Sequence, residues 1–311
     1  MKKYRILTFV LILVLIVASF SIQAQAAVSE TNVSEVEISR EDYVYKSQAL
    51  ACKALRNGIY NRIKENSSFA ADFYMTVSFK TTKYNSSTFC DDFKKELFKY
   101  DSSWSNSLKS VYSDSLRLGI KQLCVSKIKA TKKTDSTGTY YVIKVCVYGN
   151  YFLSKEQDSF MINWVNANYK KIVVGKNDYQ KSLAAYRWII KNSKYAFYKE
   201  DGREVYNTAY GPIVGYGVCR GFSHLYYMLL NRAGIPCRVV VDSTHAWNII
   251  KLDGKWYIAD VTFGLDGSKA SESKFFAVGS TRYEKQNGRN TTLYGGNITV
   301  SKTDYLIAVH N

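Results

Sequence analysis

The chain has 311 residues, of which 46% are hydrophobic, and a formal net charge of +17. This length permits one large domain or two, and the sequence contains no internal repeat and no low-complexity tract. The positive charge favours anionic partners such as an acidic surface polymer or lipid headgroups, although lysines spread along the chain are also typical of an ordinary solvated surface. Because no helix-turn-helix, zinc-finger or RNA-binding motif occurs, nucleic acid is not a predicted partner.

The first 26 residues are typical of a secretory signal peptide. They contain a basic start (residues 2–5), an apolar core (6–20) and a small-x-small cleavage signal (24–26). The apolar core is shorter than the ~20 residues that span a bilayer, and no later run is apolar enough to do so; an uncleaved anchor is the alternative. We therefore expect a mature protein that starts near Ala27, has no membrane span, and is secreted, extracellular or associated with the cell surface.

Residues 27–174 are predicted to form an accessory α+β region of unknown role. After a loose segment, periodicity predicts helices at 41–64, 88–100, 105–116 and 157–169, and strands at 73–79 and 140–147. No chemical motif occurs here, so the region is either a substrate-delivery or wall-contact module or a packing extension of the rest. No Pro/Gly/Ser-rich linker marks the boundary near residue 174.

Cys219 opens a strong helical pattern. A glycine-rich segment (210–218) precedes it, and the helix is predicted to end near Ala233, where Gly234 stops it. The apolar stripe of this helix consists of Phe222, Leu225, Tyr226, Leu229 and Leu230. In a first helical turn, unpaired N–H groups and the macrodipole favour an anion, so this position suits a reactive thiolate. Gly221 would allow another backbone to approach closely.

His245 and Asp260 lie on a predicted β-hairpin. Its strands cover 246–252 and 255–261, and an Asp-Gly pair forms the two-residue turn between them. This register sets Trp247 opposite Asp260. His245 lies two residues before Trp247, so its side chain points to the same face of the hairpin. The imidazole and the carboxylate are therefore expected to be diagonal neighbours on one face, close enough for long side chains to bridge. A slip of one residue would turn the His245 strand face away from Asp260.

The two faces of this hairpin differ in polarity. We expect the more apolar face to pack against the Cys219 helix; it carries His245, Trp247, Ile249, Trp256, Ile258 and Asp260. The opposite face is expected to be wetter and carries Asn248, Lys255 and Tyr257. Beyond the hairpin, a turn at 266–268 and strands near 274–278 and 298–300 are expected to close the sheet.

The chain has three histidines, and by elimination His245 is the partner for Cys219. His224 lies about 140° around the helix from Cys219, so it is a poor general base for that thiol. His310 is the penultimate residue, where disorder is the default. Taken alone, a buried cysteine or a single histidine is more often structural than catalytic. The order, spacing and common facing of Cys219, His245 and Asp260 nevertheless favour an activated sulfur nucleophile.

Six cysteines occur, at positions 52, 90, 124, 146, 219 and 237. None forms a CxxC pair, so the sequence predicts no zinc site and no other metal or cofactor. If Cys219 is a working thiol, five remain, and at most two disulfide bridges could form among them. Cys52, Cys124 and Cys146 lie in apolar runs and are expected to be core residues.

Several motifs together resemble the transglutaminase-like superfamily in its short bacterial form. The matching segments are 178–192, 194–195, 208–211, 217–223, 229–240, 245–248 and 253–262, within about residues 177–264. The resemblance implies an α+β papain-like core, in which a nucleophile helix packs on an antiparallel sheet. It implies that Cys219 is the nucleophile, His245 the general acid/base and Asp260 the residue that orients His245. It also implies that Tyr210 and Trp247 line the substrate site.

Residues 175–311 are accordingly expected to form the catalytic domain of a secreted acyl-transfer enzyme. The resemblance implies a thioester on Cys219 that an amine resolves by cross-linking or water resolves by hydrolysis, with peptide, protein or cell-wall amides as substrates. No calcium-binding loop occurs. Arg220, and Phe263 where a tryptophan is common, depart from the larger enzymes and leave substrate preference open. The alternative is a non-catalytic module on the same fold that binds cell wall or a partner.

Overall fold

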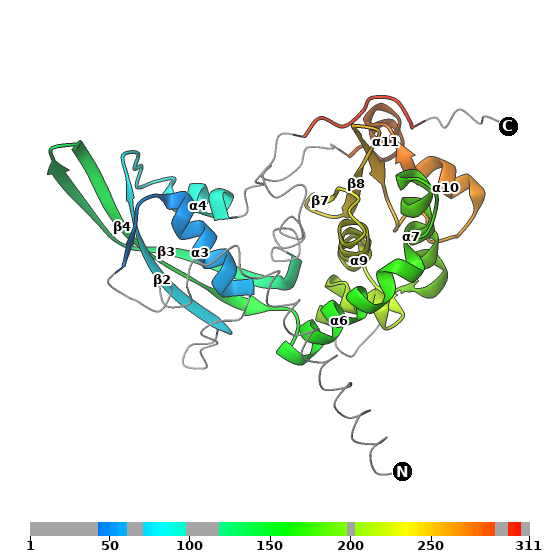
Figure 1. Ribbon diagram of the computed structural model, residues 1–311, viewed down its shortest axis with the longest axis horizontal. Helices are drawn as coiled ribbons and strands as arrows, with labels where there is room; N and C mark the ends of the chain where they lie inside the picture. The colour runs from blue at the N-terminus through cyan, green and yellow to red at the C-terminus, as the bar shows by residue number, and fades with distance from the viewer. Residues whose placement is uncertain (1–42, 61–70, 98–117, 198–202, 290–297, 306–311) are drawn as a thin grey trace, which may run out of the picture. The chain divides into compact units, whose positions relative to one another are not determined.

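The computed structural model describes residues 43–60, 71–97, 118–197, 203–289 and 298–305 (Figure 1). The predicted signal peptide, the predicted helix at 105–116 and His310 lie outside the described residues. Residues 44–311 form a single unit, so the domain boundary expected near residue 174 stays a prediction. The elements combine helices with two mainly antiparallel sheets, which confirms the predicted α+β fold class.

The first sheet has the strand order β1-β2-β4-β3. Its strands are β1 (Val44–Tyr45), β2 (Phe73–Thr81), β4 (Gly138–Tyr151) and β3 (Ile120–Asp135). β1 runs parallel to β2, and the other neighbours are antiparallel. β2 and β4 contain the two predicted strands. The sequence pattern does not predict β3, because lysines interrupt the alternation of apolar and polar residues that identifies a half-buried strand.

One face of this sheet is covered by α3 (Gln48–Tyr60) and α4 (Phe89–Leu97) (Figure 1). The side chains of β2 that point to this face are buried: Phe73, Met75, Val77 and Phe79. The ring of Phe79 stacks on those of Phe93 and Phe89 in α4, at centroid distances of 5.7 and 6.3 Å. Because side chains alternate along a strand, the intervening residues point to the second face, where most are partly exposed.

Two capped helices follow the first sheet in the chain. α6 (Lys155–Ile172) begins with a capping box, in which Ser154 and Gln157 each accept a hydrogen bond from the other's backbone N–H. α7 (Asp178–Asn192) begins at Asn177, whose side chain accepts from the Gln180 backbone. These helices match the predictions at 157–169 and 178–192. Two-residue strands, a 3-10 helix and a short helix follow: β5 (Lys194–Tyr195), η2 (Arg203–Asn207), α8 (Tyr210–Ile213) and β6 (Tyr216–Gly217).

The second sheet has the strand order β10-β9-β8-β7 and is antiparallel throughout. Its strands are β7 (Cys237–Val241), β8 (Ala246–Leu252), β9 (Lys255–Ala259) and β10 (Phe276–Val278). Leu252 pairs with Lys255 across a turn in which Asp253 and Gly254 have φ of 46° and 81°, which confirms the predicted hairpin and register. The C-terminal part also contains α10 (Lys269–Phe275) and α11 (Ser280–Asn287), which the sequence pattern does not predict.

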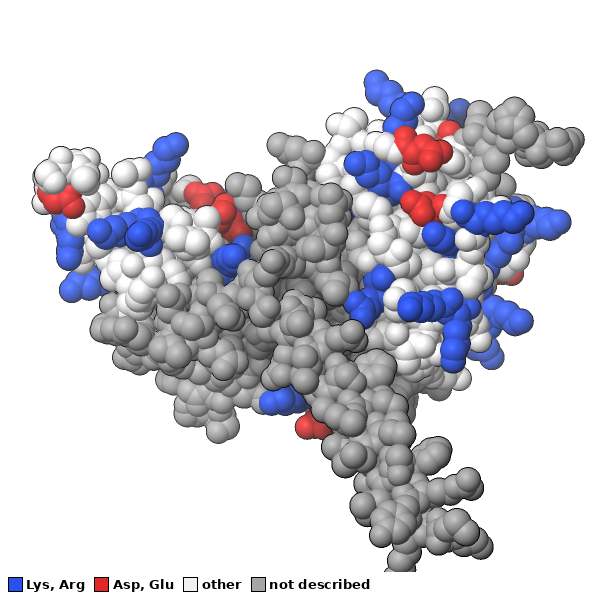
Figure 2. All heavy atoms as spheres, in the orientation of Figure 1, with Lys and Arg blue, Asp and Glu red and all other residues white. Residues whose placement is uncertain are grey.

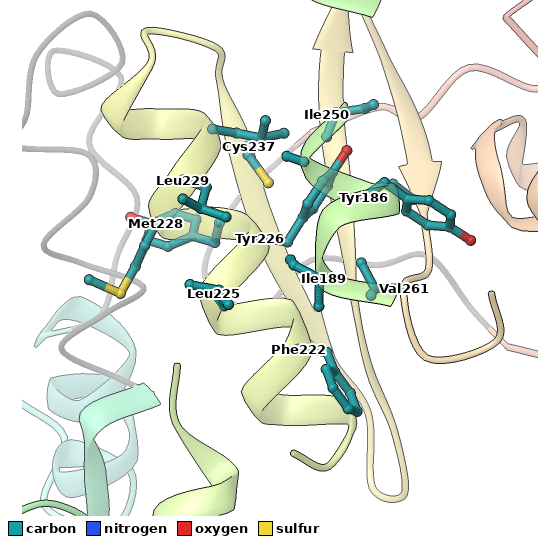
Figure 3. Close-up of a cluster of buried hydrophobic side chains, with 14 of the residues drawn as sticks. Tyr186, Ile189, Phe222, Leu225, Tyr226, Met228, Leu229, Cys237, Ile250 and Val261 are labelled. Carbon is teal, nitrogen blue, oxygen red and sulfur yellow. The ribbon is translucent and has the colours of Figure 1, made fainter. Parts of the chain in front are cut away.

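α9 (Cys219–Arg232) packs against one face of this sheet and against α7. The predicted apolar stripe is fully buried. Figure 3 shows it beside Tyr186 and Ile189 of α7 and Ile250 of β8. The helix ends at Arg232 with Ala233 as its C-cap, and Gly234 has a φ of +81°, as the predicted stop requires. A helix packed on an antiparallel sheet is the core architecture that the sequence predicts.

The prediction of which hairpin face meets α9 is wrong. The face that packs on α9 and its neighbours carries Ile250, Leu252, Tyr257 and Ala259. The face expected to meet α9 packs instead on the C-terminal residues, with Trp247, Ile249 and Ile258 around Tyr283 and Val300. Asn248 is fully buried rather than wet, because its side-chain N–H groups bond the Ser223 carbonyl of α9 at 2.9 Å and the Arg238 carbonyl at 3.3 Å.

Candidate active site

The structure brings His245 and Asp260 into direct contact at one end of the second sheet. His245 directly precedes β8 and Asp260 directly follows β9, so the hairpin register places both side chains at the same end. The Nε2 atom of His245 lies 2.8 Å from Oδ2 of Asp260. His245 is 7% exposed and Asp260 is fully buried, so their hydrogen bond is shielded from water.

Both oxygens of the Asp260 carboxylate accept hydrogen bonds. Oδ2 accepts from the Tyr283 hydroxyl at 2.6 Å as well as from His245, and Oδ1 accepts from the Phe263 backbone N–H at 3.1 Å. A buried carboxylate is costly unless donors surround it in this way. The burial of Tyr283, together with the charge of Asp260 and their hydrogen bond, raises the pKa of Tyr283 well above its ordinary value, so Tyr283 stays a neutral donor.

The backbone of Asp260 is fixed as well. Its N–H donates to the Phe275 carbonyl at 2.8 Å, and its carbonyl accepts from the Tyr186 hydroxyl of α7 at 3.1 Å. Tyr186 is fully buried in the core around α9. These bonds connect the Asp260 backbone to α7, which precedes it in the chain, and to the C-terminal end of α10, which follows it. They fix the position from which the carboxylate extends.

Cys219 is the first residue of α9, where the backbone N–H groups of the first turn lack helical partners. Burial alone lowers the pKa of His245, but hydrogen bonds to Asp260 and Cys219, together with the negative charges of both, outweigh burial and raise this pKa to about 9. The Cys219 side chain therefore lies close enough to the imidazole to influence its charge. Because Asp260 holds Nε2, Nδ1 is the ring nitrogen that remains for the sulfur.

Aromatic rings pack against the imidazole. Phe263 stacks on His245 with a centroid distance of 4.7 Å and an interplanar angle of 25°. Trp247 lies 5.9 Å away at 22° and is itself fully buried against Tyr283. Phe263 thus occupies a supporting position next to the imidazole. Trp247 supports the imidazole from within the core and does not face solvent.

The turn that leads into His245 is held by Asp242. Its Oδ1 accepts from the backbone N–H groups of Thr244 and His245, both at 2.7 Å. Its Oδ2 accepts from Nη1 of Arg289 at 2.5 Å, and the same Nη1 donates to the Thr244 hydroxyl at 3.0 Å. Burial opposes the charge of Asp242, but these hydrogen bonds and Arg289 outweigh it and lower the pKa of Asp242. Arg289 therefore fixes the loop that sets the position of the imidazole.

Three other residues that the sequence analysis named are held by contacts with the rest of the fold. His224 is fully buried and accepts a hydrogen bond at Nδ1 from the Ala209 backbone at 3.2 Å, as expected for a helix residue that is not the general base. Arg220 donates to the Leu118 carbonyl at 3.1 Å and lies over the Phe152 ring. A Cβ atom at Gly221 would clash with the Tyr206 carbonyl oxygen, which confirms the predicted close backbone approach.

Tyr210 is the first residue of α8, and its ring contacts Phe160 of α6 edge-on at 5.7 Å. Its role toward a substrate stays a prediction. Tyr195 of β5 interacts with Cys219: burial and the charge of Cys219 raise the pKa of Tyr195, while a hydrogen bond from the Cys219 backbone opposes this rise. Segment 194–195 is among the motifs that resemble the family, but the sequence analysis gave Tyr195 no role. Its place beside Cys219 depends on the pairing of β5 with β6, which ends two residues before Cys219.

Tyr283 and Arg289 are the other residues that sequence reasoning missed. Both belong to α11 or the residues just after it, a polar segment with no recognisable motif. Among the described residues, no group of three or more His, Cys, Asp or Glu side chains could hold a metal ion. Within the same residues, no helix has the length and apolarity needed to cross a membrane. None of the six cysteines, which all lie in the described residues, forms a disulfide bond.

Residues 167–261 match the family model described as the transglutaminase-like superfamily. This part of the chain is transglutaminase-like. It contains α7, α9, the β8–β9 hairpin and all three residues of the candidate triad. The match begins inside α6, which packs in the same core as α9. A comparison with curated proteins gave no match.

Solved structures similar to the chain include a TGase at 14% identity and a TM-score of 0.33, covering 64% of this chain and 56% of that one. A presumed cysteine protease from Cytophaga hutchinsonii has 20% identity and a TM-score of 0.27, with 46% and 65% covered. A presumed protease from Parabacteroides distasonis has 13% identity and a TM-score of 0.27, with 60% and 39% covered. The chain thus spans less than two thirds of the length of each of these proteins, and this similarity supports no inference about activity.

Proposed function

We propose that this protein is a secreted, cysteine-dependent acyl-transfer enzyme that acts on amides of a peptide, a protein or a cell-wall component. One observation carries the proposal: the buried imidazole of His245 is hydrogen-bonded through Nε2 to Asp260 and interacts with Cys219 at the start of α9. A pKa of about 9 keeps this ring protonated at neutral pH. A protonated imidazole is the counter-ion that a reactive thiolate needs.

The proposed reaction has two steps. The Cys219 thiolate attacks the amide carbonyl carbon, a C–S bond forms, and the C–N bond breaks as His245 gives its proton to the departing amine. An amine or water then attacks the thioester, His245 takes the proton of the attacking group, and the thiolate leaves. We expect backbone N–H groups at the start of α9 to stabilise the negative charge that develops on the carbonyl oxygen, since those of a first helical turn have no helical acceptor.

Export and substrate class are parts of the same proposal. The apolar core and small-x-small signal within residues 1–26 support secretion. The net charge of +17 supports action close to an anionic surface polymer. The departing amine would come from a lysine, a peptide nitrogen or an amino group of the wall, since all of these form amides that a thiolate can attack.

The activated thiol can be tested within one molecule. Iodoacetamide labelling of the full chain at pH 7, read by mass spectrometry at each cysteine, should modify Cys219 at least about tenfold faster than the partly exposed Cys90 and Cys124. His245→Ala should remove this excess reactivity and leave Cys90 unchanged. Equal labelling of Cys219 with and without the imidazole would contradict the activated pair.

Turnover separates the enzyme from the binding module. Incubation with a panel of amides should release amine in the wild type and none in Cys219→Ala, and incorporation of a labelled lysine analogue beside a peptidase assay distinguishes transfer from hydrolysis. Cys237→Ala is the matched control, because Cys237 is a buried thiol of β7 that does not belong to the candidate triad. Wall binding that survives Cys219→Ala, with no turnover of any amide, would favour the non-catalytic alternative.

A further inference from the structure

The second face of the β1–β4 sheet carries an unusual set of side chains, which we call the open face. Strand alternation and the observed register assign to it residues from three strands: Tyr74, Thr76 and Lys80 of β2; Tyr140, Val142, Lys144 and Tyr148 of β4; Ser126, Lys129, Thr131 and Lys133 of β3. All of these side chains are exposed or partly exposed. The face opposite is the one that α3 and α4 cover.

A β-bulge creates much of this surface. In β3, Lys127 pairs with Val145, but Lys129 pairs with Lys144, so Ile128 is an extra residue in the strand. The bulge shifts the alternation by one position and turns Lys129, and with it every second residue beyond, onto the open face. Without it, the same lysines would point toward the helix-covered side. Bulges of this kind commonly re-aim side chains for a purpose other than stability.

The arrangement of the lysines on the open face lowers the stability of the sheet. Lys129 and Lys144 are direct cross-strand partners, and like charges directly opposite each other destabilise a sheet. Among the described residues, none of Lys80, Lys129, Lys133 and Lys144 forms an ion pair. The acidic group found on this face is Asp135 at the hairpin end, near Lys80 and Tyr140. Positive charge without an ion-pair partner among the described residues therefore remains on this face for an anionic partner.

Tyrosine rings lie between these lysines. The rings of Tyr74 and Tyr148 are cross-strand partners, stacked with a centroid distance of 6.4 Å and an angle of 25°. The ammonium group of Lys80 lies 4.9 Å from the centre of the Tyr140 ring. Figure 2, in the orientation of Figure 1 with α3 and α4 in front of this sheet, shows further basic side chains and a few acidic atoms near the end of the β3–β4 hairpin.

We propose that the open face binds a linear anionic glycan, that is, a chain of sugar rings with one negative charge per ring. Tyrosine rings offer an apolar surface on which the C–H faces of sugars can pack, and their hydroxyls, with those of Ser126 and Thr131, offer hydrogen bonds. The lysines complement the acid groups. A bilayer would need large apolar side chains to insert, whereas Val142 is the aliphatic residue at the centre of this face. Nucleic acid is disfavoured by the expected export.

The test uses polygalacturonate as the anionic glycan and neutral dextran as its control, with the full chain and binding measured by titration calorimetry. Polygalacturonate should bind and dextran should not. The double variant Lys129→Gln/Lys144→Gln should weaken binding about tenfold, since it removes two adjacent charges. Its thermal stability should stay equal or rise, because the like-charge pair is gone, so a loss of binding cannot be a loss of fold.

Lys170→Gln/Lys171→Gln is the matched control, because it removes the same charge from exposed positions of α6. It should change the affinity for polygalacturonate less than about twofold. Tyr148→Ser should weaken binding with all lysines present, and Cys219→Ala should leave it unchanged, since this surface is independent of the proposed chemistry. The proposal is overturned if polygalacturonate does not bind, if both double variants lose equal affinity, or if a single-stranded oligonucleotide or phosphatidylglycerol vesicles bind more tightly.

Discussion

Tyr283 donates its hydroxyl to Oδ2 of Asp260, the same oxygen that holds the imidazole of His245. A residue of α11 thereby joins the candidate triad from a segment that carries no sequence motif. The shared oxygen means that the position and the charge of the carboxylate depend on Tyr283. Tyr283 is a positioning residue, because it acts on the sulfur only through Asp260 and His245.

Tyr283→Phe should impair the triad while keeping the core filled. The ring still packs on Trp247, but a buried carboxylate loses a donor, so the free energy of unfolding should fall by about 1.5–3 kcal/mol. The excess iodoacetamide reactivity of Cys219 should fall several-fold. Urea unfolding and per-cysteine labelling measure the two effects.

Tyr305→Phe is the control for this change. Tyr305 also donates to a carboxylate, Asp253 at 2.6 Å, but that bond is exposed to solvent. Its loss should alter the free energy of unfolding by no more than about 0.5 kcal/mol and should leave Cys219 reactivity unchanged. Similar losses in both variants would show that Tyr283 has no particular role at the triad.

The raised pKa of His245 predicts a pH dependence with a definite sign. The folded-state pKa is about 9, above the ordinary value of 6.5, so the folded state binds the proton more tightly than the unfolded state. The stabilisation is therefore fully present below about pH 6.5 and is lost as the pH rises through 9. Because the chain has three histidines, NMR can follow the titration of this imidazole, with an expected midpoint near 9.

Asp260→Asn should move that midpoint to lower pH. The substitution removes the negative charge and the charged hydrogen bond that raise the pKa, while burial, which lowers it, remains. Cys219→Ser should lower the midpoint by a smaller amount. A wild-type midpoint near 6.5, unaffected by either substitution, would contradict the triad geometry.

Arg289 should matter more for activity than for stability. Arg289→Gln removes the donor that fixes Asp242 and Thr244, so the loop before His245 gains freedom and Cys219 reactivity should fall several-fold. Arg282→Gln is the matched control. Arg282 lies on α11, but its ion pair is with Asp304, at an N–O distance of 2.6 Å, and it involves no residue of the triad. Both variants should unfold within about 1 kcal/mol of the wild type. An equal fall in reactivity in both would contradict this role for Arg289.

Gly221→Ala should be strongly destabilising. The added Cβ would overlap the Tyr206 carbonyl oxygen and lie 2.8 Å from that of Thr208, and backbone atoms cannot move away cheaply. We expect a loss of about 3 kcal/mol or more in the free energy of unfolding. At Gly119 no atom lies within 4 Å of an added Cβ, so Gly119→Ala should cost less than about 1 kcal/mol. Thermal unfolding measures both variants. Equal melting temperatures for Gly221→Ala and Gly119→Ala would contradict the predicted steric overlap at Gly221.

The sequence could predict the part of the site that depends on local geometry. The Asp-Gly turn determines the hairpin register, and the register brings His245 and Asp260 to one end of the sheet. The start of α9 at Cys219 follows from the glycine-rich entry and the apolar stripe. The catalytic roles of these three residues stay predictions, because geometry alone does not demonstrate turnover.

The parts that depend on distant contacts could not be predicted. Asn248 suggests a wet face by polarity alone, and only the position of the Ser223 carbonyl makes its burial acceptable. Tyr283 and Arg289 lie in a polar segment, and nothing in their spacing indicates that they reach Asp260 and Asp242. β3 lacks a regular alternation because its bulge at Ile128 interrupts the period of two.

In the proposed reaction, the hydrogen bond between Nε2 of His245 and Asp260 has a kinetic consequence. Phe263 stacks on the imidazole, and a flip of the ring would break a buried charged hydrogen bond, so we expect Nδ1 both to deliver the first proton and to accept the second. The departing amine and the incoming acceptor would then occupy the same position next to Nδ1, one after the other. The proposal therefore predicts double-displacement kinetics, in which water and an amine compete for a position that opens only after the first product has left.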